Sequence, residues 1–124
     1  MIRLFILFAG VFGLTGVALG AFAAHGLKNR LTPEMLTVFQ TGVQYQIYHA
    51  LALLAVALLS LHMPGRLLNA AGGLLVLGVL LFSGSLYLLT LTGVSKLGII
   101  TPIGGTAFLA GWLCLLLSAW NMRA

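Results

Sequence analysis

The segment that decides the fold is TPEMLTVFQTGVQYQIYHALALLAVALLSLHMPG (32–65). It opens with Thr32, Pro33 and Glu34, residue types that favour the N-cap, the first helical position and the positive end of a helix. Pro64 and Gly65 then end the helix. A hydrocarbon core needs only about 20 helical residues. We therefore expect this helix to cross a membrane, with its first turns in the interface or with a tilt or bend.

The composition of the whole chain supports a membrane environment. Of 124 residues, 61% are hydrophobic and only 6% are charged, whereas about a quarter of the residues of a soluble domain are charged. The net charge of +5 is thinly scattered and forms no basic run, so we expect no nucleic-acid partner. The main partner that this composition predicts is membrane lipid.

The charged residues divide the chain into four apolar stretches. We predict an all-α, integral membrane four-helix bundle in one domain, 1–124, with helices at about 4–24, 33–63, 67–91 and 102–121. The first stretch resembles a signal peptide, but it is long enough to span, and we expect it to be a transmembrane helix. Thr101-Pro102 repeats the start signal of the second helix. Cys114 has no second cysteine to pair with and is expected to be a packing residue.

The cations that flank the spans bear on orientation. An even number of spans places both termini on one side, together with Arg3, Arg66 and Arg123, while the other side holds Lys28, Arg30 and Lys96. Three cations on each side give almost no bias under the positive-inside rule. The three arginines each lie within a few residues of a span end, so we predict that both termini are cytoplasmic.

Small residues predict close helix packing. In the first span, Ala9, Gly13, Gly16, Gly20 and Ala24 recur at spacings of three and four. Such stripes let helix backbones approach where lipid supplies no hydrophobic drive. The third span adds Gly72, Gly73 and Gly84. We assign helix packing to six glycines: Gly13, Gly16, Gly20, Gly104, Gly105 and Gly111.

Polar residues of all four spans gather toward the end of the bundle distal to the termini. On the second span, Gln40, Gln44 and Tyr48 form one strip, and Thr41, Tyr45 and His49 form the next. We predict that these strips turn inward, that Val43, Ile47 and Ala50 face lipid, and that a polar pocket opens at the distal end. The candidate ligand-pocket residues are His25, Gln44, Tyr45, Tyr48, His49, Ser83 and Tyr87.

Two interpretations of these polar residues remain open. They form either a binding or permeation vestibule or a hydrogen-bonded network that only holds the helices together. His25 and His49 lie at similar depth, but no thiolate or carboxylate ligand accompanies them, so we expect no metal and no cofactor. Glu34 is the only carboxylate side chain, which excludes a paired-carboxylate mechanism and leaves a Ser-His-Asp triad without its acid. We expect no enzymatic activity.

Four segments carry a family resemblance: GAFAAHGL (20–27), TGVQYQIYHALAL (41–53), FSGSLYLL (82–89) and ITPIGGTAFLAGW (100–112). They resemble the YgdD-like family of small four-helix inner-membrane proteins, domain of unknown function 423. The match covers nearly the whole chain, and Ala23 departs from it where the family usually carries glycine. The resemblance implies a multi-pass protein of the bacterial inner (plasma) membrane. It carries over no catalytic residue.

Two functions follow as expectations. The first is a multi-pass inner-membrane protein that binds or passes a small polar or amphipathic molecule through a polar pocket at the end of the bundle distal to the termini. The alternative is an accessory or assembly subunit that joins a homo-oligomer or a larger membrane complex through its glycine-rich helix faces.

Overall fold

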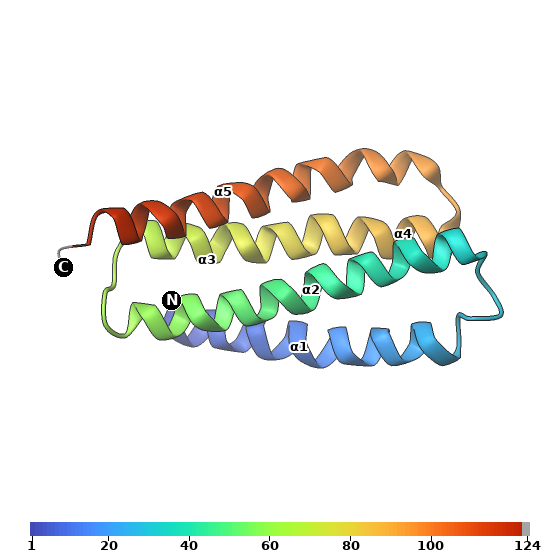
Figure 1. Ribbon diagram of the computed structural model, residues 1–124, viewed down its shortest axis with the longest axis horizontal. Coiled ribbons are helices and arrows are strands. Elements are labelled where there is room, and N and C mark those ends of the chain that lie inside the picture. The colour runs from blue at the N-terminus through green and yellow to red at the C-terminus, as the bar shows by residue number, and fades with distance from the viewer. Residues whose placement is uncertain (123–124) are drawn as a thin grey trace.

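The computed structural model describes residues 1–122 as an up-and-down arrangement of four spans (Figure 1). In chain order the elements are α1 (Ile2–His25), α2 (Pro33–Ser60), α3 (Arg66–Gly78), η1 (Val79–Ser83), α4 (Gly84–Thr92), η2 (Ser95–Ile99) and α5 (Ile100–Trp120). Together α3, η1 and α4 form the third span, and η2 leads directly into α5. All four spans are long and apolar enough to cross a membrane. The predicted all-α membrane bundle is confirmed.

The helix boundaries differ from the predicted ones by a few residues. At the start of α2, the Thr32 hydroxyl accepts a hydrogen bond from the Met35 amide at 3.2 Å, as expected of an N-cap. The helix ends at Ser60, because residues 61–63 already form a turn before Pro64. Thr101 lies inside α5 rather than at its cap, because η2 winds the chain before Ile100. Arg123 lies outside the described residues.

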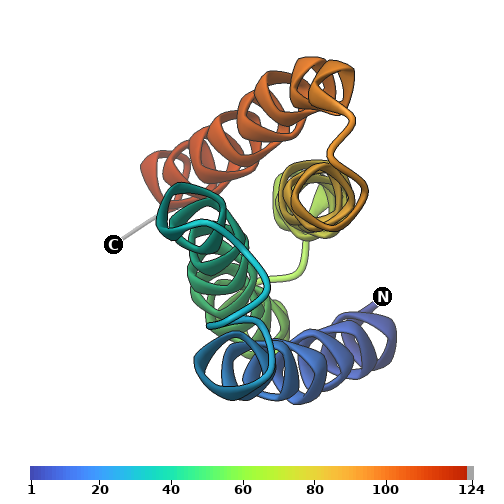
Figure 2. The ribbon, with the colours of Figure 1, turned by 90° about the vertical axis from the view of Figure 1, so that its right-hand side faces the viewer.

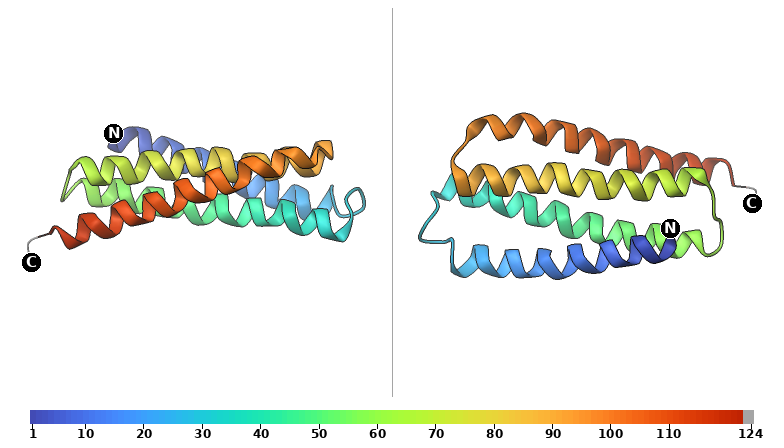
Figure 3. Two further views of the ribbon diagram at one scale, coloured as in Figure 1. Left: turned by 90° about the horizontal axis from the view of Figure 1, so that it is seen from above. Right: turned by 180° about the vertical axis from the view of Figure 1, so that it is seen from behind.

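The spans form a chain of packed pairs rather than a closed ring. The main contacts join α1 to α2, α2 to the third span, and the third span to α5. Figure 2 shows α1 and α5 at opposite edges of the molecule, and Figure 3 shows α5 running obliquely across the other helices. As a result, α1 and α5 each pack against one principal neighbour. Both edges of the bundle face the surroundings.

Two apolar clusters fill the interior at different depths. The cluster toward the termini includes Ala50 and Leu53 of α2, and the cluster at the other end includes Phe39 and Val43. Gln46 lies between the two clusters along α2 and is itself buried. The polar centre of the molecule is therefore enclosed above and below by packed apolar side chains.

Four of the six glycines assigned to helix packing lie at close contacts. A Cβ at Gly104 would lie 2.3 Å from the Phe82 backbone nitrogen, so only glycine fits there. A Cβ would lie 2.9 Å from a side chain of the neighbouring helix at Gly16, 3.3 Å at Gly20 and 3.0 Å at Gly111. Gly105 has only an ordinary contact at 3.8 Å, and Gly13 has no neighbour within 4 Å. The structure does not bring these last two into a tight helix contact.

Candidate functional site

The third span carries a π-helix, Val79–Ser83, at the point where it meets α2. Short π-helices are rare in proteins, and those that occur are often found at functional sites. Ser83 is buried, and its hydroxyl donates to the Gly42 carbonyl of α2 at 2.7 Å. A Cβ on Gly42 would lie 2.9 Å from the Tyr87 ring, so the two spans approach closely here. The widened turn and the glycine together bring Ser83 and Tyr87 against α2.

Gln46 is the centre of a hydrogen-bond network that joins three spans. Its side chain is 4% exposed, and Nε2 donates to the Phe12 carbonyl at 2.9 Å and to Thr15 Oγ1 at 2.7 Å. Its Oε1 accepts from the Tyr87 hydroxyl at 2.6 Å. The Thr15 hydroxyl in turn donates to the Val11 carbonyl at 2.7 Å. Both amide hydrogens of Gln46 are used, and α1, α2 and α4 are linked through one side chain.

A groove of about 240 Å³ lies over this network. Its polar atoms come from Thr15, Gln46 and Tyr87, and the rest of its wall is apolar or glycine: Val11, Phe12, Leu19, Val79, Leu80 and Gly84. These residues belong to α1, α2 and the third span, so the groove lies at the side of the bundle. The predicted pocket was expected at the distal end, and the structure instead places a polar-floored groove at mid-span, between the two apolar clusters.

His49 lies on a different side of α2 and joins it to α5. Its Nδ1 lies 2.6 Å from the Tyr45 carbonyl, and Trp112 Nε1–H donates to its Nε2 at 3.1 Å. Because Nε2 accepts, the ring proton belongs on Nδ1, which donates to the carbonyl, and this pattern is that of a neutral imidazole. The ring stacks on Phe108 with centroids 3.6 Å apart. Both nitrogens of His49 are thus used inside the protein.

The predicted inward strips of α2 were wrong in phase except at His49, which is buried as expected. Gln44 and Tyr48 are exposed, whereas Val43 and Ala50, which we expected to face lipid, are buried. The buried face follows the spacing Gly42, Gln46, His49 and Leu53. The polarity of the residues did not predict this buried face. The close approach of the third span at Gly42 decides which face of α2 packs, and Gln46 alone supplies the polar contacts to α1 and α4.

The remaining candidates lie apart from the groove. His25 is exposed at the end of α1, where its Nδ1 lies 2.9 Å from the Ala21 carbonyl. Tyr45 is 38% exposed and packs its ring against Phe82 with centroids 4.8 Å apart. Of the seven candidates, Tyr45, Ser83 and Tyr87 lie at the contact between α2 and the third span, and among the seven only Tyr87 lines the groove. Within residues 1–122, no group of three or more His, Cys, Asp or Glu side chains could hold a metal ion.

Sequence reasoning missed three residues of the two networks: Thr15, Gln46 and Trp112. A signal for Gln46 was present, because it falls in helical phase with Gly42, Ala50 and Leu53. Thr15 precedes Gly16, a glycine of the predicted packing stripe. No comparable signal pointed to Trp112, whose partner lies 63 positions earlier in the chain.

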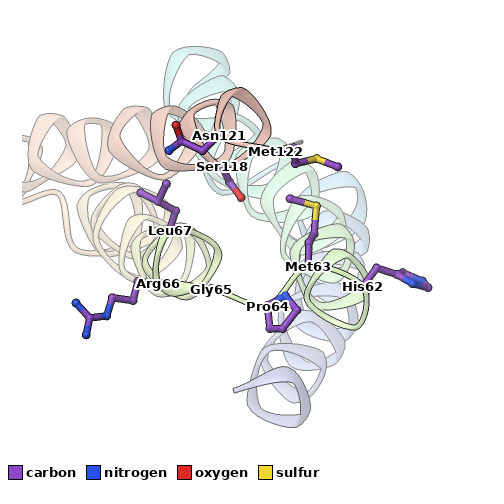
Figure 4. Close-up of a pocket in the computed structure, with 9 residues that line it drawn as sticks. All are labelled: His62, Met63, Pro64, Gly65, Arg66, Leu67, Ser118, Asn121 and Met122. Carbon is purple, nitrogen blue, oxygen red and sulfur yellow. The ribbon is translucent and has the colours of Figure 1, made fainter. Parts of the chain in front are cut away.

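A second hollow, of about 510 Å³, lies at the end of the bundle that holds the termini (Figure 4). It is lined by the 62–67 turn and by the end of α5. The polar side chains of His62 and Arg66 point away from its centre, toward the surroundings (Figure 4). Of the polar side chains that line this hollow, only the Ser118 hydroxyl is turned toward its centre (Figure 4), so few polar groups converge there.

The four apolar spans and the polar network between them define a multi-pass integral membrane protein. The comparisons with known proteins agree: residues 19–105 match the family model described as protein of unknown function (DUF423). The chain belongs to this family.

Curated relatives cover nearly the same length. The UPF0382 membrane protein YwdK of Bacillus subtilis is 45% identical over 118 residues, which cover 94% of this chain and 96% of the relative. The UPF0382 membrane protein SH2409 of Staphylococcus haemolyticus is 44% identical over 96% and 97% of the two chains. The UPF0382 inner membrane protein YgdD of Escherichia coli is 38% identical over 98% and 92%. No solved structure matches this chain.

Proposed function

We propose that this protein binds a small amphipathic molecule from the bilayer, without chemical turnover, in the groove above Gln46. The observation that carries the proposal is the hydrogen-bonded floor of Thr15, Gln46 and Tyr87 in a wall that is otherwise apolar. Polar groups inside membrane spans are costly and often mark ligand or substrate paths. The groove volume of about 240 Å³ is close to the lower end of small-molecule sites, about 300 Å³.

The unused hydrogen-bonding positions of the floor suggest the chemistry of the ligand. Both amide hydrogens of Gln46 are committed, and so are the hydroxyl hydrogens of Tyr87 and Thr15. Lone pairs on Gln46 Oε1 and on the Tyr87 oxygen are left over. The ligand therefore donates a hydrogen bond, from a hydroxyl or an N–H group on an apolar body. We favour binding over passage, because the two apolar clusters close the interior on either side of Gln46.

The proposed setting is the inner (plasma) membrane of a bacterium, with both termini cytoplasmic. The Escherichia coli relative is called an inner membrane protein. The orientation rests on the positions of Arg3 and Arg66, which lie at the first residues of spans at the end that holds the termini, because the number of cations is equal at the two ends of the bundle. The groove is open to the surrounding lipid, which is the proposed source of the ligand.

A groove-filling variant tests the proposal, with a matched control on the same span. Gly84 lines the groove, and neither Gly84 nor Gly73 has a neighbour within 4 Å of the position of a Cβ. Gly84→Leu therefore fills the groove without a backbone clash, and Gly73→Leu adds the same side chain elsewhere. In native mass spectrometry of protein extracted from its own membrane, the wild type and Gly73→Leu are expected to retain one bound molecule. Gly84→Leu is expected to lose it. A wild type that carries no bound molecule, or equal retention in both variants, contradicts the proposal.

A second candidate function is that of an accessory subunit of a membrane complex. It is favoured by α1, where Gly10 and Gly13 have no neighbour within 4 Å and α2 is the principal packing partner. Small exposed residues suit close approach of another membrane helix. A stoichiometric partner that copurifies with the wild type and is lost from Gly13→Leu would support this function.

A further inference from the structure

The outward face of α2 carries polar side chains that the bundle does not use. Gln40, Gln44 and Tyr48 recur every four residues and are exposed, Tyr48 to 57%. We call these three residues the outer polar strip. The α2 side chains that form hydrogen bonds are Thr37, Thr41, Gln46, His49 and Ser60. Within residues 1–122, the Gln44 amide and the Tyr48 hydroxyl have no hydrogen-bond partner.

The unpaired Gln44 amide and Tyr48 hydroxyl are unusual because of their depth in the membrane. The α2 helix ends at Ser60, and a core of about 30 Å takes about 20 helical residues. Counted back from Ser60, the core extends to about residue 41, so Gln44 lies inside it and Tyr48 lies near its middle. Any tilt of the helix moves the boundary toward Pro33 and places Gln44 deeper. Acyl chains offer no hydrogen bond, and an unsatisfied amide or hydroxyl there is costly.

The same side of the molecule is shaped to admit another helix. A groove of about 370 Å³ runs between α1 and α2, with Gly10 and Gly13 on one wall and Leu51 and Leu54 on the other. Leu51 follows Tyr48 by three residues, so the groove continues the outer polar strip along α2. The two glycines have no neighbour within 4 Å. Small residues at this position allow a second helix to approach closely.

We propose that a second copy of this chain covers this face, with the α2 helices of the two copies packed against each other. A side-chain amide carries both a donor and an acceptor. Gln44 therefore pairs with its own counterpart, each Nε2 donating to the other Oε1. A two-fold axis along the membrane normal brings Gln44 of each copy to the same depth, which a self-complementary interface requires. Acyl chains offer neither group, and an unrelated helix would need its own amide at this depth.

Cysteine cross-linking in the native membrane tests the geometry. In a Cys114→Ser background, Gln44→Cys is expected to form a disulfide-linked dimer on mild oxidation. Leu109→Cys and Leu116→Cys serve as controls, because these side chains are 73% and 58% exposed and lie on α5, which does not line the groove between α1 and α2. Both controls are expected to stay monomeric. No dimer of Gln44→Cys, or equally strong cross-linking of the controls, would overturn the proposal.

Dilution in lipid vesicles tests the role of the amide. Gln44 is exposed, so Gln44→Leu leaves the fold of each copy intact, and the variant is expected to dimerise about tenfold more weakly through the loss of two interhelical hydrogen bonds. Leu109→Ala is expected to dimerise like the wild type. Single-molecule photobleaching at decreasing protein density measures both. A wild type that is monomeric at every density, or native mass spectra that show a different protein on this face, would refute the second copy as the occupant.

Discussion

Replacing Gln46 by leucine tests the central network most directly. The substitution keeps the size of the side chain and removes three hydrogen bonds, of 2.9, 2.7 and 2.6 Å, from a side chain that is 4% exposed. An interhelical hydrogen bond in a membrane contributes about 0.6 kcal/mol on average and up to about 1.7 kcal/mol. The three together give about 2 kcal/mol. We expect Gln46→Leu to lower the free energy of unfolding by about this amount.

A double-mutant cycle with Tyr87→Phe separates the network from general disruption. Tyr87 donates to Gln46, so each single variant breaks the same bond, and the double variant is expected to be more stable than the sum of the single effects by about 0.5–1 kcal/mol. Gln44→Leu is the matched control, because it makes the same chemical change two residues away at an exposed position. Unfolding in mixed micelles, dilute enough to isolate single chains, measures all four variants.

The outcome that would refute this reasoning is specific. If Gln46→Leu and Gln44→Leu have equal stability, the buried network adds nothing to the fold. If the cycle is additive to within about 0.3 kcal/mol, Gln46 and Tyr87 do not interact energetically.

Three further predictions concern other contacts. Gly104→Ala is expected to lower the free energy of unfolding by about 1–3 kcal/mol or more, because the added Cβ would lie 2.3 Å from the Phe82 backbone nitrogen. Gly105→Ala is the control and is expected to leave the stability nearly unchanged, because a Cβ there has only an ordinary contact at 3.8 Å. Thermal unfolding compares the two variants. Ser83→Ala should cost about 1 kcal/mol in the same assay, because it removes a buried 2.7 Å bond to the α2 carbonyl. Trp112→Phe leaves His49 Nε2 without its donor, and the nitrogen-15 shifts of the imidazole should report the loss; unchanged shifts would exclude the contact.

The sequence predicted the number and position of the spans because local signals control them. Thr32-Pro33 starts α2 where expected, and Pro64-Gly65 separates it from α3. The inward face of α2 was not predictable in the same way. In a soluble helix the apolar side turns inward, but in a membrane both sides are apolar and packing detail decides. Gln44 and Gln46 are chemically identical, and the packing of α2 against α1 and the third span buries one and exposes the other.

The candidate site was predicted in part for the same reason. Ser83 and Tyr87 were recognised because they are polar residues toward the distal end of the third span, and the structure places both beside α2. The pairing of Trp112 with His49 joins α5 to α2 across 63 positions of the chain, and the π-helix at Val79–Ser83 lies where the third span packs against both α2 and α5. Contacts of that range have no local signature in the chain.

The π-helix has a consequence for how the length of this chain can vary. A regular helix turns by about 100° per residue, so a one-residue deletion in α3 rotates everything that follows by that angle. Such a deletion carries Ser83 and Tyr87 away from α2. Within Val79–Ser83, however, the wide turn already holds one residue more than an α-helix needs. Removing a residue there lets the turn tighten while both flanks keep their orientation. This five-residue segment is where natural or engineered length changes in the third span are expected to be tolerated.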